Sequence, residues 1–424
     1  MTPFISTRGQ ASAVDFRTAL FEGLAPDGGL YVPQKIEPLS PDSLRGAALT
    51  ELAVEIAAPY LGPSMARPVL GELLAAALDF PIPTVPLADG VSALELFHGP
   101  TFAFKDVGAR VMARLMAHFN TGDRELTVLV ATSGDTGSAV ADAFFGLEGT
   151  RVIVLFPEGG VTTVQEAQFT TLGGNVTAVA VGGTFDDCQR LVKEAFASDL
   201  RRAARLTSAN SINIGRLLPQ VFYYAHAALH SDIPIVVSVP SGNFGNLAAG
   251  LWAWRMGMPI RHFVAATTIN DAVPRYLRTG SYEPRPSVPT LANAMDVGSP
   301  SNLERIRWLF DDDIDALRQV VHGSVHTDVD LRAGIRDLWN RYRYVADPHT
   351  AIAYRGLVVS GEPIQTRRMF LATAHPAKFQ QVVEPIIGES VPLPASLAAA
   401  VARPRRIKTI SPRLSDLRPV LLER

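Results

Sequence analysis

Two short segments rich in Gly, Ser and Asn stand where an apolar run meets a helical pattern. Thr132–Gly137 (TSGDTG) follows LTVLVA, and Ser241–Asn246 (SGNFGN) follows IPIVVSVP. The first turn of a helix leaves backbone N–H groups without intrahelical partners, and small residues let an anion approach them. By this mechanism the second segment could hold the phosphate of a cofactor, and the first a carboxylate or phosphate of a substrate.

Both segments also have a plainer interpretation, because tight strand-to-helix turns favour glycine whether or not they bind an anion. Neither segment carries the Gly-Lys-Ser/Thr of a Walker loop, and neither has the G-x-G-x-x-G spacing of a dinucleotide site. ATP, GTP and NAD are therefore disfavoured as ligands.

A lysine is the third candidate for chemistry. The chain has 39 Lys and Arg residues, of which only five are lysine: Lys35, Lys105, Lys193, Lys378 and Lys408. Lys105 follows the apolar stretch TFAF and precedes VGARVMARLMAHF, which has helical spacing. Apolar surroundings lower the pKa of a lysine, which can then act as a nucleophilic amine, whereas arginine keeps its proton. The structural alternative is that Lys105 pairs with Asp106 or another carboxylate, and that Asp106 caps the helix.

A lysine able to form a Schiff base, together with a phosphate site and a second anion site, is the set of groups that pyridoxal phosphate requires. Six motifs in order then make a specific resemblance: LFHGPTFAFKD, ATSGDTG, NSINIGR, VPSGNFGN, NAMDVGSPSN and LATAHPAKF. With ISTRG and GLAPDGGLYVP near the start, they closely resemble the threonine synthase family of fold-type II pyridoxal phosphate enzymes. The resemblance runs from residue 4 to residue 395 or close to it.

The resemblance implies a cofactor site. Lys105 would hold the cofactor aldehyde as a Schiff base and later move protons at the α- and β-carbons of the substrate. Thr373 would meet the pyridine nitrogen, where a neutral hydroxyl makes the ring a weaker electron sink than a carboxylate would. Asp135 would lie near the ring hydroxyl. The cofactor phosphate would bind backbone N–H groups of Ser241, Gly242, Asn243, Phe244, Gly245 and Asn246.

The resemblance also implies a substrate site. The substrate carboxylate would bind near Thr132, Ser133 and Thr136, and the substrate phosphate near Asn210, Ser211 and Arg216. Arginine offers two parallel N–H donors to phosphate oxygens, although an arginine at a helix start is also a common surface residue. The implied reaction converts O-phospho-L-homoserine and water to L-threonine and phosphate, a carbon–oxygen lyase reaction of threonine biosynthesis.

Two other functions stay open. Another fold-type II lyase, such as a threonine or serine dehydratase or a sulfhydrylase, needs no site for a substrate phosphate, so the residues from Asn210 to Arg216 discriminate against it. A non-catalytic relative could bind the cofactor or a phosphorylated metabolite as a sensor. The presence of Lys105, Thr373 and both glycine-rich loops argues against a sensor.

The elements that must position these residues follow one pattern. Short β-branched runs alternate with helical segments, and the runs are LTVLVA, RVIVLFP, NVTAVAV, IPIVVSVP, HFVAATTI and RMFLATA. Such alternation predicts an α/β fold, here fold-type II with two parallel or mixed sheets. We expect an N-terminal domain over 1–90, a large domain over 91–125 and 215–424, and a small domain over 126–214. The cofactor would lie between the last two, and substrate would draw the small domain toward the large one.

Composition limits the remaining possibilities. The 424 residues are 47% hydrophobic and 19% charged with a net charge of -2, which favours a globular protein and disfavours nucleic acid as a partner. No apolar run approaches the roughly 18 residues of a membrane span. The start lacks an export signal and Cys188 is the only cysteine, so we expect a cytoplasmic monomer or homodimer. RPRRIK near residue 405 is interpreted as solvated surface.

Overall fold

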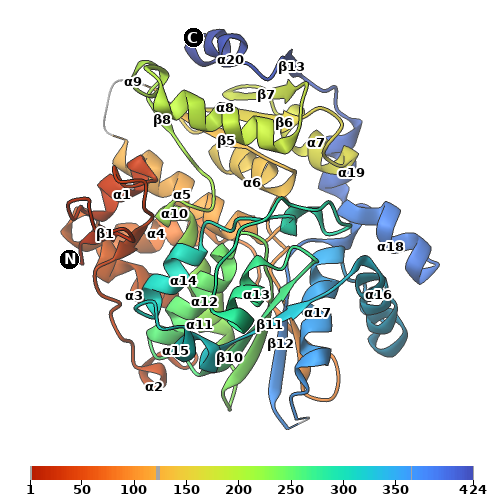
Figure 1. Cartoon of the computed structure of the whole chain (residues 1–424). Helices are drawn as coiled ribbons and strands as arrows, with labels where there is room; N and C mark the ends of the chain where they lie inside the picture. The colour runs from red at the N-terminus through yellow and green to blue at the C-terminus, as the bar shows by residue number, and fades with distance from the viewer. Residues whose placement is uncertain (1, 121–124, 364, 424) are drawn as a thin grey trace.

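The computed structural model describes residues 2–120, 125–363 and 365–423, and within them the chain forms three sheets (Figure 1). One sheet has the strand order β11-β10-β9-β12-β4-β3, and another has the order β13-β7-β6-β5-β8. All pairs in these two sheets are parallel except β3 with β4. The third sheet joins β1 and β2 antiparallel. The predicted α/β class with parallel and mixed sheets is confirmed.

The six-stranded sheet forms the large domain. Its strands read as continuous apolar runs because helices cover both faces. Val236 packs with Tyr354 and Leu357 of α17 on one face, while Val237 belongs to the core of α11 and α12 on the other. The strands are β3 (Thr84–Pro86), β4 (Val91–Glu95), β9 (Ile235–Pro240), β10 (Ile260–Thr267), β11 (Val321–Val325) and β12 (Arg367–Ala372). The helices are α5 (Lys105–Phe119), α10 (Ile214–Leu217), α11 (Gln220–Leu229), α12 (Gly245–Arg255), α13 (Ala272–Thr279), α14 (Leu303–Leu309), α15 (Ile314–Val320), α16 (Asp328–Tyr342), α17 (Pro348–Ser360) and α18 (Gln380–Ile387).

The five-stranded sheet forms the small domain, which lies above the large one in Figure 1. One face packs on α8, where Cys188 and Leu191 are fully buried, and the other packs on α6 and α7. The strands are β5 (Leu126–Ala131), β6 (Thr150–Pro157), β7 (Val176–Val181), β8 (Leu206–Thr207) and β13 (Ile407–Ile410). The helices are α6 (Asp135–Phe144), α7 (Thr163–Thr170), α8 (Phe185–Ala197), α9 (Leu200–Ala203), α19 (Ala395–Ala402) and α20 (Leu414–Leu422).

The six β-branched runs predicted from sequence correspond to β5, β6, β7, β9, β10 and β12, so these strand predictions are confirmed. Strands β3, β4, β8, β11 and β13 were not predicted. They are two to five residues long, too short to show a period of their own.

The N-terminal region shares its core with the large domain. Tyr60 packs edge-on against Phe4 at 6.1 Å and against Trp252 of α12 at 5.3 Å between ring centroids. Strand β3, at residues 84–86, belongs to the large sheet, so the predicted boundary at residue 90 lies several residues too late. The elements are β1 (Phe4–Ser6), α1 (Phe16–Glu22), β2 (Tyr31–Pro33), α2 (Pro41–Leu44), α3 (Leu49–Leu61) and α4 (Arg67–Ala77).

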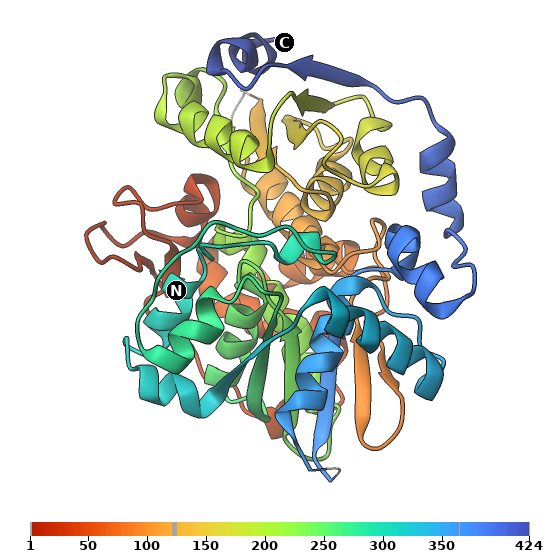
Figure 2. The same ribbon diagram turned by 45° about the vertical axis from the view of Figure 1, so that its right-hand side comes forward.

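The C-terminal segment leaves the large domain after α18 and returns to the small one, as Figure 2 shows. Strand β13 pairs in parallel with β7, and Leu417 and Leu421 of α20 enter the core beside Leu191. The prediction that the large domain extends to residue 424 is therefore wrong for this segment, because apolar side chains of α20 complete the core under the small sheet. Residues 121–124, inside the predicted segment 91–125, lie outside the described residues.

The basic cluster near residue 405 takes part in this attachment. Arg405 pairs with Glu166 of α7 at 2.5 Å, and Lys408 pairs with Glu423. No helix among the described residues is long and apolar enough to cross a membrane.

Candidate active site

The ends of three neighbouring strands bring the predicted cofactor residues to one edge of the large sheet. Strand β12 lies between β4 and β9 in parallel, with Ala372 beside Glu95 and Phe370 beside Ser238. The loops after these strands carry Lys105, Thr373 and Ser241–Asn246. Carboxyl ends of parallel strands are the usual ligand-binding edge of an α/β sheet. Phe104 N donates to Thr373 O at 2.9 Å, which sets Lys105 directly beside Thr373.

Lys105 is the first residue of α5, and its surroundings favour a neutral amine. Burial lowers the pKa of Lys105 to about 8; Asp135 opposes this shift, while Arg216 and Lys378 add to it. The Asp106 carboxylate accepts from Thr101, from the backbone N at 2.9 Å and from the side-chain hydroxyl. Asp106 is therefore not the partner of Lys105, and the carboxylate whose charge acts on Lys105 is that of Asp135. Burial also raises the pKa of Asp106 to about 6.

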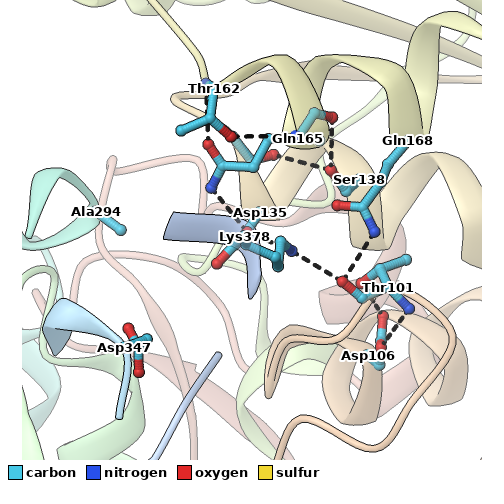
Figure 3. Close-up of polar contacts among 12 residues, drawn as sticks. Thr101, Asp106, Asp135, Ser138, Thr162, Gln165, Gln168, Ala294, Asp347 and Lys378 are labelled. Carbon is cyan, nitrogen blue, oxygen red and sulfur yellow. Dashed lines mark hydrogen bonds and ion pairs between the residues drawn. The ribbon is translucent and has the colours of Figure 1, made fainter. Parts of the chain in front are cut away.

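A hydrogen-bonded cluster around Asp135 joins the two domains (Figure 3), and its charges act on Lys105. Lys378 Nζ contacts Asp135 Oδ1 at 2.6 Å and donates to Thr101 O at 2.8 Å. Gln165 Nε2 donates to Asp135 Oδ1 at 2.9 Å, and Gln168 Nε2 donates to Thr101 O at 2.9 Å. Burial raises the pKa of Asp135, but Lys378, Lys105 and the two donors to the carboxylate outweigh burial and lower it to about 2. Asp135 is therefore ionised at any physiological pH.

The loop after β5 has two partly exposed side chains, Ser133 and Thr136, and one buried threonine. Thr132 is 0% exposed, and its Oγ1 accepts from Gly134 N at 2.9 Å and Gly137 N at 2.8 Å. The Thr132 hydroxyl is thus taken up by its own loop, and it shapes the turn. Of the three residues expected at the substrate carboxylate, Ser133 and Thr136 have the more accessible side chains.

The loop after β9 leads into the N-terminus of α12. Phe244 has φ 60°, and its carbonyl is the first intrahelical acceptor, bonded by Ala248 N at 3.0 Å. The N–H groups of the first turn therefore have no acceptor within the helix. Asn246 is 6% exposed; its Oδ1 accepts from Tyr223 and Tyr224, and its Nδ2 has no partner among the described residues.

The backbone of Asn293–Met295 packs against this loop. A Cβ at Gly242 would lie 2.7 Å from Met295 Cα and 2.9 Å from Ala294 O, so a glycine is needed there. The segment is held by His349, whose Nε2 accepts from Ala294 N at 3.3 Å, while its Nδ1 contacts Asp347 at 2.7 Å. Figure 3 shows Ala294 and Asp347 on the side of the cluster away from Asp106.

The segment from Asn210 to Arg216 links α5 to the α12 loop. Asn213 caps α10 by accepting from Gly215 N at 2.9 Å, and Asn243 Nδ2 donates to Ser211 Oγ at 2.6 Å. Arg216 is 4% exposed and donates to Ala209 O at 2.7 Å, but its buried Nε has no partner in the described part of the chain. Burial lowers the pKa of Arg216 to about 10, against the opposing charge of Asp106.

Several predicted residues therefore lie close together: Thr373, Asp135 and Arg216 near Lys105, and Ser211 beside Asn243. Sequence reasoning missed Lys378, Gln165 and Gln168, which complete the cluster around Asp135. The scarcity of lysine could have pointed to Lys378, since the same argument singled out Lys105.

Comparison with known proteins identifies the family. Residues 89–370 match the family model of pyridoxal-phosphate dependent enzymes, residues 3–78 that of the threonine synthase N terminus, and residues 350–420 that of the threonine synthase C-terminal region. The threonine synthases of Serratia marcescens and Escherichia coli (strain K12) are each 42% identical to this chain, over 421 and 419 residues and 96% of both chains.

Solved structures agree with this comparison. The crystal structure of threonine synthase from Escherichia coli has a TM-score of 0.93 and 40% identity, and covers 99% of both chains. The PLP-bound threonine synthase from Brucella melitensis has a TM-score of 0.94 and 34% identity, over 100% of this chain and 99% of that one. The expected resemblance, fold type and pyridoxal phosphate cofactor are confirmed. The chain belongs to the threonine synthase family of pyridoxal phosphate-dependent enzymes.

Proposed function

We propose that this protein converts O-phospho-L-homoserine and water to L-threonine and phosphate. The observation that carries the proposal is Arg216, a buried guanidinium beside Lys105 with an unpartnered Nε and no ion pair among the described residues. Asp106 acts on this guanidinium only through its charge, without a direct ion pair, and a buried cation that no anion contacts is costly, so such a site favours an anion. A substrate phosphate supplies an anionic group in addition to the α-carboxylate, whereas the substrates of a dehydratase carry the carboxylate alone.

Pyridoxal phosphate fits the residues present. Its phosphate would bind backbone N–H groups from Gly242 to Asn246 at the start of α12, since the N–H of Ser241 already donates to Ala266 O at 2.8 Å. Asn246 Nδ2, which has no partner among the described residues, adds a donor. Thr373 would face the pyridine nitrogen and Asp135 the ring hydroxyl. The chemistry that the cofactor supplies when bound is electron withdrawal from the α-carbon of an amino acid, which makes the α- and then the β-protons acidic.

Lys105 is the base in this proposal. With a pKa near 8, part of the amine is neutral at physiological pH, so the amine can take a proton from the α-carbon and then one from the β-carbon. The bond between the γ-carbon and the phosphate oxygen breaks, and Arg216 with Asn210 and Ser211 holds the departing dianion. The oxygen of water bonds to the β-carbon and gives up one proton, which balances the proton that the departing phosphate takes up to leave as the dianion, and protons return to the α- and γ-carbons.

The small domain would bind the other end of the substrate. Ser133 and Thr136 are partly exposed at the start of α6, where the free N–H groups favour a carboxylate. Because this loop is in the small domain and Lys105 is in the large one, substrate would draw the two together and exclude water. Hydrogen exchange at residues 131–138 should therefore slow when a substrate analogue is added.

The test is incubation of the holoenzyme with O-phospho-L-homoserine while threonine and phosphate are measured together. We expect equal amounts of the two products, and kcat/KM should fall by about 100-fold or more in Arg216→Met. Arg403→Met, at an exposed arginine, is the matched control and should be unchanged. An Arg216→Met enzyme as active as the wild type would remove the reason for the proposal.

The same preparation separates the alternatives. A dehydratase would release ammonia from L-serine or L-threonine and would not respond to Arg216→Met. A sensor would bind the cofactor or a phosphorylated metabolite without turning over any of these substrates.

A further inference from the structure

Lys378 is a buried lysine that the proposed reaction does not use. Its side chain is 0% exposed, yet it carries a charge-bearing nitrogen into the interior after β12. Burial of an ammonium is expensive unless its N–H groups are paired. Both of its partners, Asp135 and Thr101, are next to the residues that the reaction needs.

Lys378 follows β12 of the large domain, and of its two contacts the one with Asp135 crosses between the domains. Thr101 is four residues before Lys105 in the large domain, and Asp135 begins α6 in the small domain. Gln165 and Gln168, one helical turn apart on α7, repeat the same pair of contacts. Lys378 therefore holds the start of α6 against the segment that leads to Lys105 (Figure 3).

The charge of Lys378 has a second consequence, which depends on the cofactor position proposed above. In that position the ionised carboxylate of Asp135 lies near the ring hydroxyl of the cofactor, so a carboxylate oxygen and the ring oxygen compete for one proton. An uncompensated carboxylate there would also stabilise a proton on the nitrogen of Lys105. A cation on Asp135 Oδ1 neutralises this carboxylate and leaves Oδ2 to meet the cofactor.

We propose that Lys378 is a positioning residue that neutralises Asp135 and holds α6 in register with α5, and that it thereby sets the protonation of the nitrogen at Lys105. It acts through Asp135, not on the substrate.

Several other charged groups face this cluster and must be considered. They are Lys105 and Asp106 on α5, Asp135 and Asp142 on α6, Arg216 on α10, Asp347 before α17, His98, and His375 before Lys378. Burial lowers the pKa of His375 to about 4 and raises that of Asp106 to about 6. Both have completed most of their titration below about pH 7, and Arg216, with a pKa of about 10, titrates above about pH 9, so a titration between these limits reports mainly on the nitrogen at Lys105.

The experiment is a pH titration of the visible absorbance band of the holoenzyme, which reports the protonation of the nitrogen that links the cofactor to Lys105. In Lys378→Met the apparent pKa should rise by about one unit, because a repelling cation is lost while Asp135 stays. In Asp135→Asn it should fall by a similar amount. The double variant should titrate close to the wild type, and Lys378→Arg should restore the wild-type value.

A merely structural role would give a different pattern. It predicts lower thermal stability in both single variants without opposite shifts of the titration. Lys193→Met, at an exposed lysine of α8, is the matched control and should change neither property. If Lys378→Met does not fold, Asp135→Asn remains a test, because an unchanged apparent pKa in that variant would overturn the inference. If both single variants fold, shifts of the apparent pKa in the same direction would also overturn it.

The outcomes keep this inference apart from the proposed function. Opposite shifts in an enzyme that does not act on O-phospho-L-homoserine would refute the proposed substrate and support the role of Lys378. Release of threonine by an enzyme whose apparent pKa is the same with and without Lys378 would support the proposed substrate and refute the role of Lys378.

Discussion

Replacing Gly108 by alanine displaces Arg216 without changing its charge. Gly108 lies one turn after Lys105 on α5, and its Cα faces the start of α10. An added Cβ would stand 2.8 Å from Arg216 O and 3.1 Å from Arg216 Nε. Real Cβ atoms do not approach a backbone oxygen so closely, so Arg216 must retreat.

The size of the effect follows from these distances. Relief of the contact requires a shift of about 0.5 Å, and because misplacement by about 1 Å can cost 10²-fold in rate, we expect about a tenfold fall in kcat/KM. Overpacking costs about 1–3 kcal/mol, and the better helix propensity of alanine returns about 1 kcal/mol of it. The protein should therefore stay folded.

The assay is steady-state kinetics with O-phospho-L-homoserine, together with inhibition by inorganic phosphate. KM and the phosphate inhibition constant should both rise, while the visible band of the cofactor stays as in the wild type. Gly71→Ala on α4 is the matched control, since its Cβ would meet only Val54 Cγ2 at 3.8 Å. A Gly108→Ala enzyme with normal kcat/KM would refute the role given to Arg216.

Three further predictions concern other parts of the molecule. The raised pKa of Asp106 makes the wild type lose about 3 kcal/mol of stability as pH climbs from about 4 to about 6, and Asp106→Asn lacks this loss. In denaturant unfolding the stability difference between the two proteins should therefore move in favour of the variant by about that amount over this range, and a difference that does not change with pH would contradict this. Leu417→Ala, at a fully buried position of α20, should lower the free energy of unfolding by about 2–5 kcal/mol. Leu422→Ala, at a position 42% exposed on the same helix, should lower it by under about 0.5 kcal/mol. Equal losses of stability in thermal unfolding would show that α20 is not part of the core. Gly242→Ala should weaken pyridoxal phosphate binding about tenfold or more, because the added methyl meets the backbone of Met295, and an unchanged dissociation constant by fluorescence titration would count against the α12 loop as the phosphate site.

Much of the fold could be predicted because its signals are local. Strands β5, β6, β7, β9, β10 and β12 are continuous apolar runs, and parallel strands covered on both faces have this pattern. The path after α18 could not be predicted. Strand β13 is four residues long and mostly exposed, and it is a strand only because the edge of β7 is there to pair with it.

Part of the candidate site could likewise be predicted from the sequence, and part could not. Lys105 and the two glycine-rich loops have recognisable local sequence patterns, and neighbouring parallel strands bring the loops after them to one edge. The partnership of Lys378 with Asp135 joins residues far apart in the chain through a contact between domains. The motif around Thr132 gives the position of this residue but not the direction of its hydroxyl, which accepts hydrogen bonds from its own loop.

Borohydride reduction of the holoenzyme followed by peptide mass spectrometry tests the attachment of the cofactor most directly. Reduction fixes the cofactor to the amine that holds it, and the chain offers only five lysines, two of them in this cluster. We predict the label on Lys105 alone and its loss in Lys105→Ala. A label on Lys378, or no label on any lysine, would contradict the account.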